Sequence, residues 1–276
     1  MSFGRMGGLG RVFGRLGASS GVSIVYDPAA LAFFARLTTP PTTARKAAYN
    51  TVFVSLRSAS LLTGKLDLLW LAGADSQATR QNLIQDAYNL TAVASPAFVA
   101  DRGYTSDGTT SYLDSNFTPS TAGGNFQQNS LSLGAWGRTV GNTGKTCGAN
   151  TGGTGSAFIR PFNGAGSSDF NSVANAAISD TTAGQGGTGL AAGARAASGT
   201  HRQYRNGSLV ASPARASTAN AAAKLFFCAS SDNTNAVNLP STSQIAAGFA
   251  GGNLTDAEMT SLYSIINTYL TQIGAA

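Results

Sequence analysis

The chain has 276 residues, of which 42% are hydrophobic, and carries a formal net charge of +6. This length and apolar content are enough for a sizeable core. Only 11% of the residues are charged, against roughly 25% in average globular domains, which predicts a surface of hydroxyls and amides and argues against a cytosolic enzyme.

The positive charge is confined to the first 60 residues. They hold seven basic residues against Asp27 alone, whereas the rest of the chain holds 11 basic and 11 acidic residues. The body shows no basic face with interleaved aromatics, so we expect no specific nucleic-acid partner. No apolar run approaches the roughly 18 residues that span a membrane, so we expect no membrane partner. Gly and Arg interrupt the N-terminal apolar residues, which is unlike a secretory signal.

Residues 1–22 are rich in Gly and Arg and contain Phe-Gly-Arg twice, at Phe3 and at Phe13. By itself such a segment cannot form a core, because ordering Gly is costly and its apolar groups are few. Two interpretations remain: a flexible leader, or a docking peptide that binds a larger assembly. In the second, the docking side chains are Phe3, Arg5, Leu9, Arg11, Phe13, Arg15 and Leu16.

Residues 23–64 are expected to form a helical region. Ser23–Tyr26 could be a short strand. Asp27 and Pro28 supply an N-cap and a first helical residue, which predicts a helix over 29–37. A second helix is predicted from Thr42 or Thr43 to about Ser60, because its apolar residues recur at spacings of three and four.

Residues 65–276 are predicted to form a β-sandwich closed by a C-terminal helix. Leu66–Leu71 is expected to be the first buried strand and 75–81 a short helical turn. Asn206-Gly207 is the strongest hairpin signal, since this pair favours a two-residue turn. Short strands separated by such turns indicate a sandwich or jelly roll. The other predicted strands are 89–93, 97–100, 111–114, 130–138, 157–162, 199–205, 208–211, 224–229 and 245–250.

The closing helix is the best specified element. Thr255 and Glu258 are spaced as a capping box, and Leu254 and Met259 as a hydrophobic staple. Apolar residues from Met259 to Ile273 then lie on one helical face, and Gly274 is a natural stop.

Four landmarks resemble the laminin-G-like, concanavalin-A-like jelly-roll family over roughly residues 98–260. They are an Asp-Gly turn with its following strand, a strand ending in Trp, a Tyr-x-Asn-Gly hairpin, and a Leu-Thr-x-x-Glu helix cap. In this chain they lie at 105–114, 130–136, 204–210 and 254–258. The resemblance implies a mainly β jelly roll, an architecture used more often to bind and decorate than to catalyse.

The layout of a Gly/Arg leader, two short helices and a jelly roll also resembles virion proteins of tailed phages. This resemblance implies a fibre, spike or head-decoration component, localised to the particle and docked by its leader. The implied partners are other virion proteins of the capsid, portal, collar or tail, and a second copy of the chain in a homo-oligomer. The alternative is an adhesin that binds a host-surface glycan.

Catalysis is not expected. Glycoside hydrolases on this scaffold need two facing carboxylates, and the single glutamate, Glu258, serves the helix cap. The single histidine, His201, lies in a predicted strand without a nucleophile-elbow motif.

No cofactor is expected, although calcium on rim loops is an open alternative with Asp101, Asp107, Asp169 and Asp232 as donors. Glycan contact would need exposed aromatic rings with amide partners. The candidates are Tyr104, Phe126, Tyr204, Asn233 and Asn235, with core packing as the alternative for every strand aromatic. Cys147 and Cys228 are expected to be buried free thiols rather than a disulfide.

Overall fold

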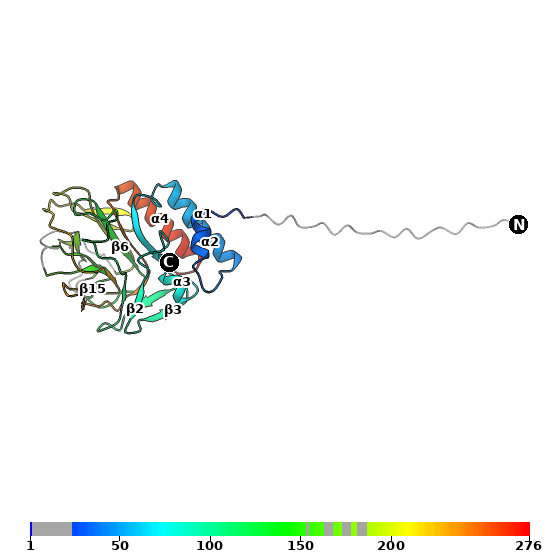
Figure 1. Ribbon diagram of the computed structural model, residues 1–276, viewed down its shortest axis with the longest axis horizontal. Coiled ribbons are helices and arrows are strands. Elements are labelled where there is room, and N and C mark those ends of the chain that lie inside the picture. Colours follow the sequence, from blue (N-terminus) through cyan, green and yellow to red (C-terminus); the bar gives the residue numbers. More distant parts are fainter. Residues whose placement is uncertain (2–23, 153–154, 163–167, 173–177, 181–186) are drawn as a thin grey trace.

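The computed structural model describes residue 1 and residues 24–152, 155–162, 168–172, 178–180 and 187–276. In these residues two β-sheets pack together, and helices cover the outer face of one of them (Figure 1). The predicted mainly β sandwich with a C-terminal helix is therefore confirmed. None of the described helices is long and apolar enough to cross a membrane.

The helix-covered sheet has the strand order β13-β12-β11-β6-β17-β4-β3, with β1 paired to β17. Its pairings are antiparallel throughout the described strands. The strands are β1 (Leu66–Leu71), β3 (Ala97–Val99), β4 (Gly103–Thr105), β6 (Leu131–Gly137), β11 (Gly189–Arg195), β12 (Arg202–Arg205), β13 (Ser208–Ala211) and β17 (Gln244–Gly251).

The other sheet, which we call the outer sheet, has the order β10-β9-β8-β7-β14-β5-β2, and β15 pairs with β7 and β16. Its strands are β2 (Thr91–Val93), β5 (Tyr112–Asp114), β7 (Cys147–Ala149), β8 (Ala157–Arg160), β9 (Ser168–Ser172), β10 (Ile178–Asp180), β14 (Phe226–Phe227), β15 (Ser230–Ser231) and β16 (Val237–Asn238).

Four helices are described, and each follows an Asp or Thr N-cap; the caps predicted for the first and the last of them are confirmed. They are α1 (Pro28–Phe34), α2 (Thr43–Ser58), α3 (Ser76–Arg80) and α4 (Asp256–Gln272). The capping box of α4 is formed, because Thr255 accepts from the Glu258 N–H and Glu258 accepts from the Thr255 N–H. Gly274 has a φ of +70° after the last turn, as a helix stop requires.

Two hydrophobic cores lie on the two faces of the helix-covered sheet. Along β1, Leu69 and Leu71 face the helices, whereas Leu68 and Trp70 face the outer sheet. This double burial explains why Leu68–Leu71 is a continuous apolar run instead of an alternating one. Because residues of the predicted helical region and of the sandwich share the helix-side core, the helices form a third layer of one packed unit.

Several predicted elements differ from the observed ones. The strand expected over Ser23–Tyr26 is wrong, since Ile24–Tyr26 form no strand and Ile24 and Val25 are exposed without a sheet edge to pair with. β4, β7, β9, β10, β11, β15 and β16 were not expected as strands. The two cysteines are buried free thiols, as predicted.

Candidate functional site

Near the start of the described chain, Asp27 is hydrogen-bonded to α2. The Asp27 N–H donates to Asn50 Oδ1 over 2.6 Å, and the Asp27 carboxylate receives two hydrogen bonds from Arg57, of 2.7 and 2.8 Å. The same carboxylate accepts from the Ala29 N–H and so caps α1. The hydrogen bonds from Arg57 and the Ala29 N–H hold the pKa of Asp27 below its ordinary value, although burial opposes them. The described chain is thus held to the helical layer at Asp27.

Several exposed apolar side chains lie on this layer and on the segment that leads to it. Val25 is 88% exposed, Leu31 on α1 is 52% exposed and Val54 on α2 is 46% exposed. Ile24 is also exposed. Val99, Val140, Leu209 and Leu239 are exposed as well, so the helical layer holds some of several exposed apolar side chains on the described surface.

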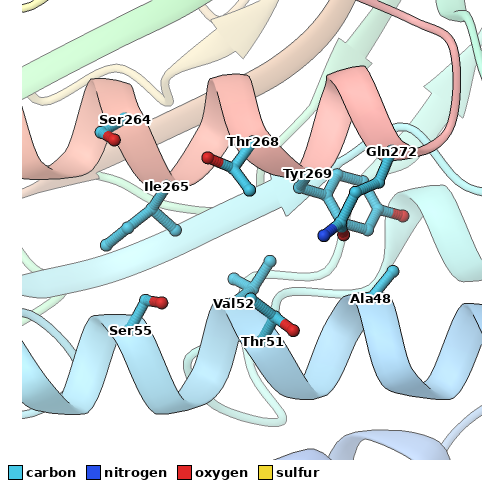
Figure 2. A pocket seen from close by; sticks show the side chains of 9 residues that line it. All are labelled: Ala48, Thr51, Val52, Ser55, Ser264, Ile265, Thr268, Tyr269 and Gln272. Atoms are coloured by element: carbon cyan, nitrogen blue, oxygen red, sulfur yellow. The ribbon is translucent and has the colours of Figure 1, made fainter.

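A groove runs along the seam between α2 and α4 (Figure 2). Figure 2 shows its middle part, where Ala48, Thr51, Val52 and Ser55 of α2 face the α4 side chains across the seam. We call this the α2–α4 groove; its lining from α4 includes Ser264, Ile265, Thr268, Tyr269 and Gln272.

The lining of the α2–α4 groove is small and almost uncharged. The groove side chains of α2 recur at spacings of three and four, which places them on one face of the helix. Arg45, at the end of the groove near Gln272, is the one charged side chain among the lining residues. Hydroxyls and methyl groups of this kind suit close contact with another uncharged protein surface.

The predicted docking side chains cannot be compared with this layer. Phe3, Arg5, Leu9, Arg11, Phe13, Arg15 and Leu16 all lie outside the described residues. What the structure adds is the surface from which the leader starts, namely Ile24, Val25 and the Asp27–Arg57 pair. We call this surface, together with Leu31, Val54 and the α2–α4 groove, the attachment face.

Three of the predicted glycan contacts are buried. Tyr104 and Phe126 are each 1% exposed and belong to the core between the sheets, and Tyr204 is 0% exposed beneath α4. The Tyr104 hydroxyl donates to Ser76 O, and that of Tyr204 donates to Asp256 Oδ1. These rings offer no face to a sugar, because each is packed inside a hydrophobic core. The structure corrects the prediction for these three residues.

Asn233 and Asn235 do lie on the surface, in a turn over residues 232–236 that we call the rim turn. Asp232 Oδ1 accepts from the N–H groups of Thr234 and Ala236, which fixes the turn. Asn235 Oδ1 accepts from the Lys224 N–H, so the Asn235 amide is partly used by the fold.

Of the possible calcium donors, the three with described side chains serve separate parts of the fold. Asp101 pairs with Arg45, at 2.7 Å, and Asp232 holds the rim turn. Asp107 accepts from the N–H groups of Ser111, Thr109 and Thr110, and these bonds hold its pKa well below the ordinary value. Asp169 lies in β9, at a position whose side chain is not described. Within the described residues, no group of three or more metal-binding side chains converges.

The acidic groups serve the fold. Twelve carboxylates are present, and all except Asp169 and Asp180 have described side chains. Asp67, which is 3% exposed, accepts from the Asn125 and Phe126 N–H groups. Those that cap helices, hold turns or pair with Lys or Arg are Asp27, Asp75, Asp86, Asp101, Asp107, Asp114, Asp232, Asp256 and Glu258.

His201 also lies inside the protein, at 0% exposure. Burial, together with the charges of Arg195 and Arg215, lowers its pKa to about 3 and keeps the ring neutral. Arg195 donates to the carbonyls of Ser198 and Arg215 and so fixes the loop that leads to His201. The burial of His201 has no sign in the sequence, because a histidine in a predicted strand does not indicate which way it faces, and Arg195 lies in β11, which was not predicted.

The chain matches no model of a known protein family. No curated protein sequence matches it either.

Several solved structures share the general fold. A Trypanosoma rangeli sialidase mutant with trans-sialidase activity aligns with 80% of this chain and 39% of its own, at 9% identity and a TM-score of 0.46. The binding domain of botulinum neurotoxin serotype D aligns with 75% of this chain and 52% of its own, at 13% identity and a TM-score of 0.48.

Domain 4 of AbnA, an extracellular arabinanase from Geobacillus stearothermophilus solved with arabinotriose, aligns with 72% of this chain and 98% of its own. Its identity is 16% and its TM-score 0.44. This chain thus spans 39% and 52% of the sialidase and neurotoxin structures. At these identities and TM-scores the likeness describes a β-sandwich and carries no argument about ligands.

Proposed function

We propose that this chain is a non-enzymatic structural protein of a phage particle, a fibre, spike or decoration component held by its N-terminal leader and attachment face. The observation that carries the proposal is the tether of Asp27 to Asn50 and Arg57. It fixes the start of the described chain on the helical layer, which lies on the side of the molecule away from the outer sheet (Figure 1). A particle that holds the leader therefore lies next to the helices and leaves the outer sheet projecting.

The charge distribution supports this arrangement. All of the net positive charge falls in the first 60 residues, and the remainder is neutral. A basic leader favours an acidic partner surface, whereas a neutral body poor in charge adds little long-range attraction of its own. The proposed partners are other virion proteins of the capsid, portal, collar or tail, with further copies of this chain arranged symmetrically around them.

The occupation of the acidic groups supports a non-enzymatic role. The described carboxylates cap helices, fix turns or pair with basic side chains, so using one in chemistry would remove a structural contact. His201 is buried and neutral. A binding or structural role requires none of these groups to change protonation.

The test is incorporation into particles. A variant that lacks residues 1–21 is expected to fold with the circular dichroism and melting temperature of the full chain, and to be lost from purified particles. The full chain carrying Leu209→Ala, on an exposed β13 residue, is the matched control and is expected to stay with the particle. Retention of the truncated chain at full occupancy would contradict the proposal.

Glycan binding at the rim turn is the second candidate. It is favoured by one observation: Asp232 fixes a turn that presents the exposed side chain of Asn233 beside Asn235. Each site would bind a sugar weakly, and several copies on one particle would add avidity. The chain over residues 22–276, labelled and added to host cells with competing polysaccharide, distinguishes this role. Competed binding that Asn233→Ala abolishes would support it, and binding that Asn233→Ala leaves intact would exclude the rim turn.

A further inference from the structure

His201 is the single histidine of the chain, and it lies directly before β12. Arg202 of β12 pairs with Ala194 of β11, so His201 and Arg195 are the next residues along the two strands. The His201 side chain is 0% exposed, and among the described residues neither ring nitrogen has a hydrogen-bond partner. A neutral imidazole always carries one N–H, so the fold leaves a buried donor unpaired. Such a group costs free energy and favours any conformation that exposes it to water.

The charges that act on the His201 ring within the described residues are cationic. Burial is the main cause that lowers the pKa of His201 to about 3, and the guanidinium groups of Arg195 and Arg215 lower it further. The outer sheet carries Asp169 on β9 and Asp180 on β10, at positions whose side chains are not described. A proton on the buried ring would therefore add a third cation beside two arginines.

Two segments meet beside His201, namely residues 196–200 between β11 and β12 and residues 212–217 after β13. We call them the His201 loops. The Arg215 N–H donates to Gly199 O over 3.1 Å, and the Ser217 N–H donates to Ser198 O over 2.8 Å. Arg195 Nη1 donates to the carbonyls of Ser198 and Arg215, at 2.9 and 2.8 Å. Hydrogen bonds thus hold the two loops to each other and to Arg195.

The His201 loops contribute little apolar burial. Residues 196–199 and 214–216 are exposed, and neither described core contains a residue of the loops. Segments with few buried apolar contacts open at a smaller free-energy cost than the whole fold. The loops can therefore separate while the two sheets stay packed.

From this arrangement we propose that the His201 loops form an acid-sensitive switch: acidification opens them locally, because only the open arrangement accommodates a proton on His201. Opening exposes His201 and Arg195 to solvent and leaves both sheets folded. The switch does not rest on attachment to a particle, and either proposal can fail without the other.

The direction of the pH effect follows from linkage. The closed ring stays neutral, whereas the ring in the open loops has the ordinary histidine pKa of about 6.5 and takes up a proton below it. The stabilisation of the closed loops is therefore complete above about pH 6.5 and falls as the pH falls. For one proton, the opening constant rises about thirtyfold between pH 7.5 and pH 5. Histidine is the side chain that ordinarily titrates in this range, and this chain has one.

The test is amide hydrogen exchange of the full chain at pH 7.5 and pH 5, with each rate divided by its intrinsic rate at that pH. The reporters are the N–H groups of Arg215 and Ser217, because both donate across the loops. Their opening constants are expected to be about thirtyfold larger at pH 5. The Asn235 N–H donates to Asp232 O in the rim turn, far along the chain from the loops, and its opening constant should not change.

Matched variants separate titration from loop stability. His201→Gln keeps a polar side chain but removes the titrating group, so the two reporters should give the same opening constant at both pH values. Thr200→Ala is the control. It removes the hydroxyl that accepts from the Ala196 and Ala197 N–H groups, and it keeps the histidine. Opening should increase at both pH values in this variant, and the thirtyfold ratio should remain.

The ring itself gives an independent readout. Because His201 is the single histidine, a chain with ¹³C-labelled histidine gives one set of imidazole signals. In the native chain these signals should keep the chemical shifts of a neutral ring down to pH 5. In urea they should titrate near pH 6.5.

Three results would overturn the proposal. One is an opening constant of the Arg215 and Ser217 amides that is equal at pH 7.5 and pH 5. Another is titration of the native ring near pH 6.5, since the closed fold would then accept the proton. The third is a pair of loop amides that open no more often than the buried Ile266 amide of α4, because the loops would then open only when the whole chain unfolds.

Discussion

Asp27 and Arg57 lie 30 residues apart and join through two hydrogen bonds, Nε–Oδ2 at 2.7 Å and Nη2–Oδ1 at 2.8 Å. The pair connects the cap of α1 to the last turn of α2. The Asp27 side chain is 6% exposed and that of Arg57 is 52% exposed, so the carboxylate is enclosed by the fold and the guanidinium covers it. The start of the described chain is thereby fixed to the helical layer.

Replacing Asp27 tests this tether. Asp27→Ala removes both an N-cap and an ion pair and is expected to lower the free energy of unfolding by about 1–2 kcal/mol. Asp27→Asn keeps a good N-cap and should cost less. Asp86→Ala, which removes an exposed partner of Arg36 at 3.4 Å, is the control and should change stability by less than about 0.5 kcal/mol. Urea unfolding measures all three, and an equal loss for Asp27→Ala and Asp86→Ala would show that the tether carries no stability.

The same carboxylate predicts a dependence on pH. The pKa of Asp27 is lower in the folded chain than in the unfolded chain, so the unfolded state binds more protons as the pH falls. Its stabilisation is complete above the ordinary aspartate pKa of about 3.9 and is lost as the pH falls toward the folded-state pKa. The stability difference between the wild-type chain and Asp27→Asn should therefore shrink below about pH 4. A difference that stays constant down to pH 2 would contradict the assigned ion pair.

The cap of α4 gives a further prediction. Glu258 accepts from the Thr255 N–H and pairs with Lys65, at 3.0 Å. Glu258→Ala is expected to cost about 0.5–2 kcal/mol, the usual range for a lost cap, and to remove no catalytic activity. Glu258→Gln keeps the capping box but removes the ion pair with Lys65, so its loss of stability measures the contribution of that pair. If the glutamine variant loses as much stability as the alanine variant, the ion pair and not the cap is responsible.

The two thiols should be silent in the folded protein. Burial raises the pKa of Cys228 to about 12 and that of Cys147 further still, which leaves almost no reactive thiolate at neutral pH. A maleimide at pH 7.5 should therefore modify neither cysteine in the native chain and both after unfolding in guanidinium. If only one cysteine or neither is modified in the unfolded chain, and a reductant restores modification of both, the chain contains a disulfide.

Elements with strong local signals were predictable from the sequence. Thr255 and Glu258 mark the start of α4, and Asn206-Gly207 forms the turn between β12 and β13 with both residues at positive φ. Local chemistry decides such features, because a cap or a two-residue turn involves only neighbours in the chain.

Strands decided by tertiary contacts were not predictable. β11 (Gly189–Arg195) consists largely of Gly and Ala, which have low strand propensity, yet it lies between β6 and β12 in the helix-covered sheet. Small residues suit this place because both faces of the sheet are covered. On the neighbouring strand β6, the Phe249 ring likewise occupies the space beside Gly134, where a Cβ would lie 2.5 Å from it. Periodicity gives no sign of such a strand.

The candidate site was predictable only in part. The leader could be identified by its composition. The attachment face could not, because the exposure of Ile24, Val25 and Val54 depends on how α1 and α2 pack. Tyr104 and Tyr204 were misplaced as surface contacts, since a strand aromatic gives no indication of its facing side.

The most direct test of attachment through the helical face is protection of engineered thiols on assembled particles. Because both native cysteines are buried, Val54→Cys on α2 and Asn233→Cys on the rim turn can be labelled against a silent background. In the free protein both variants should react with a maleimide. In particles, our account predicts that Val54→Cys is protected while Asn233→Cys reacts as in the free protein. Free reaction of Val54→Cys together with protection of Asn233→Cys would reverse the orientation and contradict the account.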